Sequence, residues 1–251
     1  MCGIAGALVY DARTAHLDSL EAAVAASASR GTDSFGVVRW SPSQGFRQLR
    51  GLGSHRQNWL DLIGRPCLDE PTVFLHTSRA EPTTEWQREK SEADIPPFLD
   101  AGIAVAHNGI IANDHELATQ YGIRPTTPID TAVIPPLVAR LGVRQTLALL
   151  KGGAALAILD SATRRLVLCR NFMPLALIWE PGVVSFASEA SFFPGMADAF
   201  RSFQFWEIPP FTGIELSQDG FSAPFKWGSP PESTNPAPRW RPYPSLSRSE
   251  A

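Results

Sequence analysis

A cysteine directly follows the initiator methionine, and the apolar run GIAGALVY follows the cysteine. Because residue 2 is small, we expect Met1 to be removed, which leaves a free α-amino group on the residue that carries the thiol. An α-amine has a pKa of about 7.7–8.0, so it is partly neutral near physiological pH and can accept the thiol proton. Cys2 is therefore a candidate nucleophile that needs no histidine. A cysteine that starts a buried strand is equally compatible with a small core residue, so position alone leaves both interpretations open.

Several other catalytic devices are missing from the sequence. It contains no GxxxxGK[ST] phosphate-binding loop, and GLGSHR lacks the third glycine of a dinucleotide-binding turn. The five histidines show no HExxH or similar metal-ligand spacing. The sequence therefore predicts neither a metal nor another cofactor.

Composition narrows the class of protein further. The 251 residues are 44% hydrophobic and carry a formal net charge of −3, which gives no general attraction to nucleic acid or anionic membranes. No apolar run approaches the roughly 18 residues of a membrane span, and no basic segment precedes Arg13 as in a signal peptide. Three cysteines without a CxxC pair favour a reducing compartment. We therefore expect a cytoplasmic protein with no nucleic-acid or membrane partner.

Short apolar runs separated by turns predict a chain rich in strands. The expected strands span residues 3–10, 34–40, 45–51, 71–78, 101–109, 154–160, 165–170, 175–179 and 183–188. The strand 101–109 is expected to end in a turn at its last three residues, HNG, because Asn and Gly are common turn formers.

Helical segments are expected between these strands. Thr14 is a candidate cap for a helix that closes near residue 31, and residues 55–64 form a short amphipathic piece. Asn113 and Glu116 together resemble a capping box for a helix that stops near residue 122. Pro135 and Pro136 are expected to interrupt a further helical stretch over residues 130–142.

The helices cluster along the chain rather than alternating strictly with strands, which favours an α+β layered sandwich. After residue 217 the sequence becomes rich in proline and serine. We therefore expect one catalytic domain over residues 1–217 and a C-terminal tail over residues 218–251.

Four further motifs follow MCGIAG in order along the chain. They are RGTDSFG at 30–36, LHTSRAEPTTEW at 75–86, VAHNGIIAN at 105–113 and IDTAVI at 129–134. Together they resemble the class II glutamine amidotransferase domains, which are N-terminal nucleophile hydrolases, over residues 1–195. Each motif alone is a weak pattern, but five in order favour the nucleophile interpretation of Cys2.

The resemblance implies a four-layer αββα sandwich and glutaminase chemistry. The Cys2 thiol would attack the side-chain amide of glutamine and form a γ-glutamyl thioester. By resemblance, the Asn108 side-chain amide and the Gly109 backbone N–H would stabilise the tetrahedral oxyanion. Taken alone, this Asn–Gly pair would be interpreted as a simple turn.

Substrate-binding residues also follow from the resemblance. Arg79 matches the position that holds the substrate α-carboxylate, and Asp130 matches the one that holds the α-ammonium group. Asp130 is otherwise a candidate helix cap beside Thr131. Arg30 and Asp33 are expected to organise the turn behind the nucleophile, or alternatively to form a structural ion pair.

The chain departs from the family pattern around Arg79. One extra residue separates His76 from the arginine, and AEPTTEW replaces the usual run that follows it. These differences affect the loop expected to close over glutamine. Trp86 is a candidate hydrophobic lid for that loop, or an exposed loop aromatic.

No segment after residue 195 is long enough for a synthase domain. We therefore expect the ammonia to pass to a separate synthetase, the alternative being that it escapes into solution. The RAEPTTEW loop resembles amidotransferases paired with 7-deazaguanine nucleoside enzymes. Two alternatives are a hydrolase of another γ-glutamyl amide and a catalytically inactive binding module.

Overall fold

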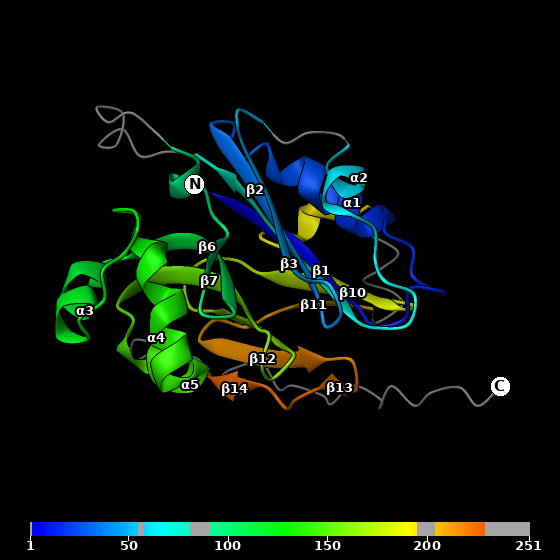
Figure 1. The fold of residues 1–251 in the computed structure, drawn as a ribbon. Coiled ribbons are helices and arrows are strands. Elements are labelled where there is room, and N and C mark those ends of the chain that lie inside the picture. Colours follow the sequence, from blue (N-terminus) through cyan, green and yellow to red (C-terminus); the bar gives the residue numbers. More distant parts are fainter. Residues whose placement is uncertain (1, 55–57, 81–90, 195–203, 229–251) are drawn as a thin grey trace.

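The computed structural model describes residues 2–54, 58–80, 91–194 and 204–228. These residues form two antiparallel sheets packed face to face (Figure 1). The first sheet has the order β11 (Phe205–Glu207), β9 (Ala176–Glu180), β10 (Val183–Ala187), β1 (Gly3–Val9), β4 (Thr72–Arg79), β2 (Ser34–Ser41) and β3 (Gly45–Leu52). The second has the order β13 (Gly220–Phe221), β12 (Thr212–Ser217), β8 (Arg165–Arg170), β7 (Gly152–Asp160), β6 (Ile103–Ile111) and β5 (Phe98–Asp100), with β14 (Phe225–Lys226) also paired to β12.

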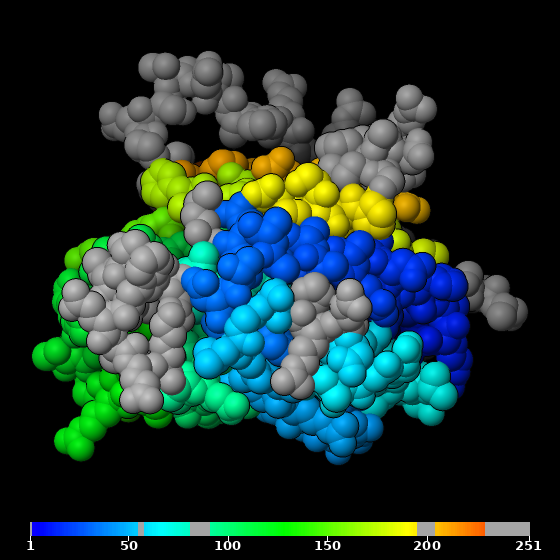
Figure 2. Space-filling view, turned by 90° about the horizontal axis from the view of Figure 1, so that it is seen from above, coloured from blue at the N-terminus to red at the C-terminus, as the bar shows by residue number. Residues whose placement is uncertain are grey.

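Helices cover the outer face of each sheet. The first sheet packs against α1 (Asp18–Ser27) and α2 (Trp59–Ile63), and Figure 2 shows N-terminal segments, in blue and cyan, on this face. The second sheet packs against α3 (Asp114–Gln120), α4 (Ile134–Leu141) and α5 (Val143–Leu149). Short 3₁₀ turns span Glu92–Asp94, Asp130–Val133 and Ala190–Phe192. The predicted α+β fold, a four-layer αββα sandwich, is confirmed.

Strand β1 shows why its apolar run is continuous rather than alternating. Ile4 and Leu8 belong to the core between the two sheets, whereas Ala5, Ala7 and Val9 pack beneath the helices of the first sheet. Successive side chains of a strand point to opposite faces, so a strand covered on both sides needs apolar residues at every position. The expected strand 3–10 is confirmed and lies in the middle of the first sheet.

One of the expected caps is wrong, and the other has the expected position without the expected side-chain bond. Helix α1 begins at Asp18, and the Thr14 hydroxyl instead bonds the Asp11 carboxylate at 3.1 Å in the preceding turn. Asn113 is the N-cap residue of α3, as expected, but its side chain makes no capping bond. Its Nδ2 donates to the Leu149 carbonyl at 3.0 Å, and its Oδ1 accepts from the Lys151 N–H at 2.9 Å. The Asn113 side chain therefore bonds backbone groups of a segment that is distant in the sequence, instead of capping the helix as the local pattern predicted.

The two prolines begin a helix instead of interrupting one. Residues Asp130–Val133 form the 3₁₀ turn, and α4 then starts at Ile134 with Pro135 and Pro136 in its first turn. The first N–H groups of a helix have no intrahelical acceptor, so proline loses nothing there and its φ already suits the helix.

The domain also extends beyond residue 217, which corrects the expected boundary. Strands β13 and β14 pair with β12, and Trp227 is buried with its Nε1–H donating to the Leu147 carbonyl at 2.8 Å. Prolines and serines separate the apolar residues of this segment. Its composition therefore did not indicate that these apolar residues belong to the folded domain. Residues 229–251, the rest of the expected tail, lie outside the described part.

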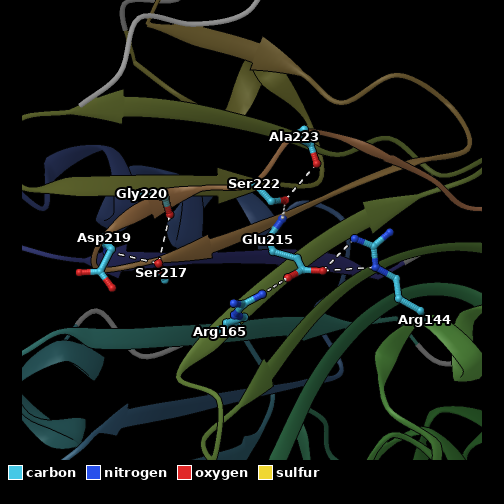
Figure 3. A network of polar contacts seen from close by, with 8 residues as sticks. All are labelled: Arg144, Arg165, Glu215, Ser217, Asp219, Gly220, Ser222 and Ala223. Carbon is cyan, nitrogen blue, oxygen red and sulfur yellow. Dashed lines mark hydrogen bonds and ion pairs between the residues drawn. The ribbon is translucent and has the colours of Figure 1, made fainter. Parts of the chain in front are cut away.

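A polar cluster joins β12 to α5 and to the neighbouring β8 (Figure 3). Glu215 on β12 accepts hydrogen bonds from Arg144 of α5 at 2.8 Å and from Arg165 of β8 at 2.6 Å. The Arg144 guanidinium also lies 3.1 Å from the centre of the Phe225 ring. Partial burial alone would raise the pKa of Glu215, but the two arginines outweigh it and the pKa is lowered.

Within the described ranges, no helix is long and apolar enough to cross a membrane.

Candidate active site

The predicted catalytic and substrate-binding residues surround one cavity of about 640 Å³. Cys2 reaches it from the start of β1, and Arg79 from the end of the neighbouring β4. The opposite wall comes from Asn108 and Gly109 on β6 of the second sheet and from Asp130 in the 3₁₀ turn. Segments more than 100 residues apart in the sequence thus meet where the two sheets face each other.

The Cys2 thiol is held as a neutral group. Its Sγ lies 3.9 Å from the Ala80 carbonyl oxygen, to which the S–H donates. Burial raises the pKa of the thiol, although the nearby Arg79 guanidinium acts in the opposite direction. Such a thiol needs a proton acceptor at the moment of attack.

Arg30 supports the backbone of the nucleophile. Its Nε donates to the Cys2 carbonyl at 3.1 Å, and its Nη1 pairs with the Glu189 carboxylate. The Asp33 N–H donates to the Arg79 carbonyl at 3.0 Å and so holds the end of β4. Sequence reasoning missed Glu189, because no local pattern marks a partner 159 residues away from Arg30.

The Asn108 side chain lines the same cavity as the Cys2 thiol. It shares a face of β6 with Ala104 and Ala106, which pack between the two sheets, so its side chain points toward the first sheet. Only 1% of Asn108 is exposed, and among the described residues neither its Oδ1 nor its Nδ2 has a hydrogen-bond partner. Buried amides are normally paired, so this one is free for a ligand in the cavity.

Gly109 lies inside a strand rather than in a turn, so the expected strand end at HNG is wrong. Strand β6 continues to Ile111 and stays paired with β7 throughout. The φ of Gly109 is +139°, and a Cβ atom there would lie 2.0 Å from the Gly153 carbonyl oxygen. Only glycine can adopt this backbone conformation and leave room for the Gly153 carbonyl of the paired strand β7.

Asp130 is anchored to β6. Its Oδ2 accepts from the Ile111 N–H at 2.7 Å, and its Oδ1 accepts from the Thr131 hydroxyl at 3.0 Å. It makes no helix-capping bond, so the alternative interpretation as a cap is wrong. The carboxylate is instead fixed beside the cavity.

His107 is a site residue that sequence reasoning did not select. Its Nδ1 lies 2.7 Å from the Thr131 hydroxyl oxygen and 3.9 Å from Asp130 Oδ1. Burial lowers the pKa of its imidazole, which keeps the ring neutral. The sequence feature that could have identified His107 is its position directly before Asn108.

Two expectations cannot be placed. Met1 and Trp86 lie outside the described residues, as does most of the segment expected to close over the substrate. In the described ranges, no group of three His, Cys, Asp or Glu side chains is arranged to hold a metal ion.

The described residues place a thiol, an unpaired amide, a cation and an anchored carboxylate around one cavity. That set suits acyl transfer from a small zwitterionic amide.

Comparison with known sequences points to one family. A family profile described as a glutamine amidotransferase domain matches residues 84–194. The 7-cyano-7-deazaguanine synthase 2 of Sulfurisphaera tokodaii is 35% identical over 200 residues, which are 76% of this chain and 42% of that protein. The 7-cyano-7-deazaguanine synthase of Saccharolobus solfataricus is 33% identical over 228 residues, 87% and 46% of the two chains. The chain thus spans less than half the length of these curated relatives.

Comparison with solved structures concerns the fold. The glutamine phosphoribosylpyrophosphate amidotransferase from B. subtilis superposes with a TM-score of 0.66 and 18% identity, over 90% of this chain and 49% of that one. A structure described as the allosteric regulatory enzyme of purine biosynthesis gives a TM-score of 0.62 and 19% identity, over 90% and 49% of the two chains. The match to the glutamine amidotransferase domain profile over residues 84–194 and the shared fold together confirm the predicted resemblance to class II glutamine amidotransferase domains.

Proposed function

We propose that this domain hydrolyses the side-chain amide of glutamine through Cys2 and delivers the ammonia to a separate synthase unit. The observation that carries the proposal is the Asn108 amide, which is buried, unpaired among the described residues and in the same cavity as the Cys2 thiol. A donor without a structural partner is what a developing oxyanion requires.

The reaction proceeds in two balanced steps. The α-amine of Cys2, freed by removal of Met1, takes the thiol proton as the sulfur attacks the amide carbon. The resulting oxyanion is stabilised by the Asn108 amide and the Gly109 N–H. Its collapse breaks the C–N bond, the amine returns the proton to the leaving nitrogen, and ammonia departs from a γ-glutamyl thioester. Water then attacks the thioester, giving glutamate and restoring the thiol.

Glutamine recognition uses two charged side chains that line the cavity. Arg79 binds the α-carboxylate, for which a guanidinium offers two parallel donors. Asp130 binds the α-ammonium group. Arg30 acts one step behind the nucleophile, because its bond to the Cys2 carbonyl fixes the strand start without contacting substrate.

The nitrogen acceptor is proposed from the relatives. Both are named as synthases of a 7-deazaguanine compound, and each is more than twice as long as its matched region. We therefore propose an acceptor unit whose chemistry belongs to nucleoside modification.

The test is glutamate release from glutamine. The wild-type protein is compared with Cys2→Ser and with a protein that retains an extra residue before Cys2. Cys67→Ser is the matched control, since Cys67 is a half-buried thiol that does not line the cavity. We expect activity in the wild type and in Cys67→Ser only. Equal rates in all four proteins would refute the mechanism. Intact-mass detection of a thioester on Cys2 would establish the intermediate directly.

A further inference from the structure

We infer that His107 is a positioning residue that orients the Asp130 carboxylate through the Thr131 hydroxyl. The inference rests on the proposed function, because it concerns how Asp130 receives the α-ammonium group of glutamine. His107 acts on substrate binding without touching the reacting atoms.

The hydrogen-bond directions follow from the atoms available. An ionised carboxylate only accepts, so the single Thr131 hydroxyl proton points to Asp130 Oδ1 at 3.0 Å. The Thr131 oxygen is then left to accept, and its other neighbour is His107 Nδ1 at 2.7 Å. His107 must therefore carry its proton on Nδ1. The relay runs from the imidazole to the hydroxyl to the carboxylate.

The other ring nitrogen agrees with this assignment. His107 Nε2 is buried and has no hydrogen-bond partner among the described residues. A protonated Nε2 would leave a buried donor unpaired, and a doubly protonated ring would add a buried charge. The neutral ring with its proton on Nδ1 avoids both.

The direction of the side chain separates His107 from the nucleophile. His107 shares a face of β6 with Val105 and Ile103, which pack toward the helices of the second sheet. Asn108 points the opposite way, toward the first sheet and Cys2. His107 therefore supports the end of the cavity that holds Asp130, not the end that holds the thiol.

The relay completes the support of the carboxylate. The Ile111 N–H fixes Oδ2 at 2.7 Å, and Thr131 fixes Oδ1. Without His107, the Thr131 hydroxyl can rotate and its bond to Oδ1 is no longer enforced. The carboxylate then turns about its remaining bond and meets the ammonium group poorly.

The kinetic test compares two substrates that differ only in the α-amino group, glutamine and 4-carbamoylbutanoate. We expect His107→Leu and Thr131→Val each to raise KM for glutamine about tenfold, with kcat within about twofold of the wild type. His107→Asn and Thr131→Ser keep a donor at the same place and should restore KM. On 4-carbamoylbutanoate all variants should match the wild type. The exposed His115→Leu serves as the control.

The two substitutions also act in series. The double variant His107→Leu/Thr131→Val should therefore be no worse than either single variant. Additive losses, or equal losses on both substrates, would overturn the inference.

A second readout does not depend on activity. Long-range ¹H–¹⁵N spectra of protein labelled with ¹⁵N-histidine should report the Nδ1–H tautomer for His107, and Thr131→Val should remove that preference. An Nε2–H tautomer in the wild type would overturn the relay. Absence of glutamate release by the wild type would instead refute the proposed function, and the spectra would still decide the relay.

Discussion

Replacing Asn108 by leucine should make the protein more stable and less active at the same time. The side chain is 1% exposed, and both of its polar atoms lack a partner among the described residues. A buried polar group that is left unpaired costs about 1–3 kcal/mol, and an apolar side chain of similar branching removes that cost. We therefore expect Asn108→Leu to gain about 1 kcal/mol, which raises Tm by roughly 2–4 °C in a domain of this size.

The same substitution removes a proposed oxyanion donor. Loss of one such donor typically raises the barrier by about 2.7–4 kcal/mol, a reduction of about 10²–10³-fold in kcat. Because the amide contacts the oxyanion mainly in the transition state, KM for glutamine should change little.

Asn171 provides a matched control for this prediction. It is also buried, but its Oδ1 accepts from the Ala154 N–H at 2.7 Å and its Nδ2 donates to the Gly152 carbonyl at 2.8 Å. Asn171→Leu leaves these backbone groups unpaired and should cost about 3 kcal/mol or more. The two leucine variants should thus move Tm in opposite directions.

The assay combines thermal unfolding by circular dichroism with steady-state glutamate release. A lower Tm for Asn108→Leu would mean that the amide is a structural group with a partner. Unchanged kcat would mean that it does not stabilise the oxyanion. Either result refutes the reasoning.

Three other predictions concern the strand, the polar cluster and the domain boundary. Gly109→Ala should lower the stability by about 3 kcal/mol or more, seen as a lower urea midpoint, since the new Cβ would lie 2.0 Å from a carbonyl oxygen; an unchanged midpoint would contradict this. The lowered pKa of Glu215 predicts stability that is present above its ordinary pKa of 4.5 and is lost as the pH falls through the lower folded value. Glu215→Gln should flatten that dependence in denaturation at pH 7 and pH 3, and parallel curves would contradict it. Truncation after residue 228 should preserve Tm, whereas truncation after residue 217 should lower it by removing Trp227; equal melting would restore the earlier boundary.

The sequence pattern predicted most strands, and the family resemblance implied the order of the layers. The strands could be predicted because strands covered on both faces must be apolar at every position, as β1 is. The motifs also predicted which residues meet, and Cys2, Arg79, Asn108, Gly109 and Asp130 do line one cavity.

What the sequence did not predict depends on distant partners. The Asn113 side chain bonds residues 36 and 38 positions further along, so its local helix-capping pattern was misleading. Glu189 pairs with Arg30 across 159 positions. The hydrogen bond of His107 depends on Thr131, which the 3₁₀ turn brings into contact with β6. Such contacts are set by tertiary packing, on which local propensity has no bearing.

The central place of β1 has a consequence for the timing of maturation. Residues 3–9 pair on one side with 72–78, and residues 5–9 pair on the other with 183–187. At about 5–20 residues per second, a ribosome needs roughly 10–40 s to make the chain between β1 and the strand at residues 183–187. The N-terminus therefore leaves the ribosome long before both neighbouring strands of β1 have been synthesised. Under the proposed mechanism, this interval is when an aminopeptidase can free the α-amine of Cys2. Synthesis that outruns the aminopeptidase should yield folded protein with a blocked nucleophile.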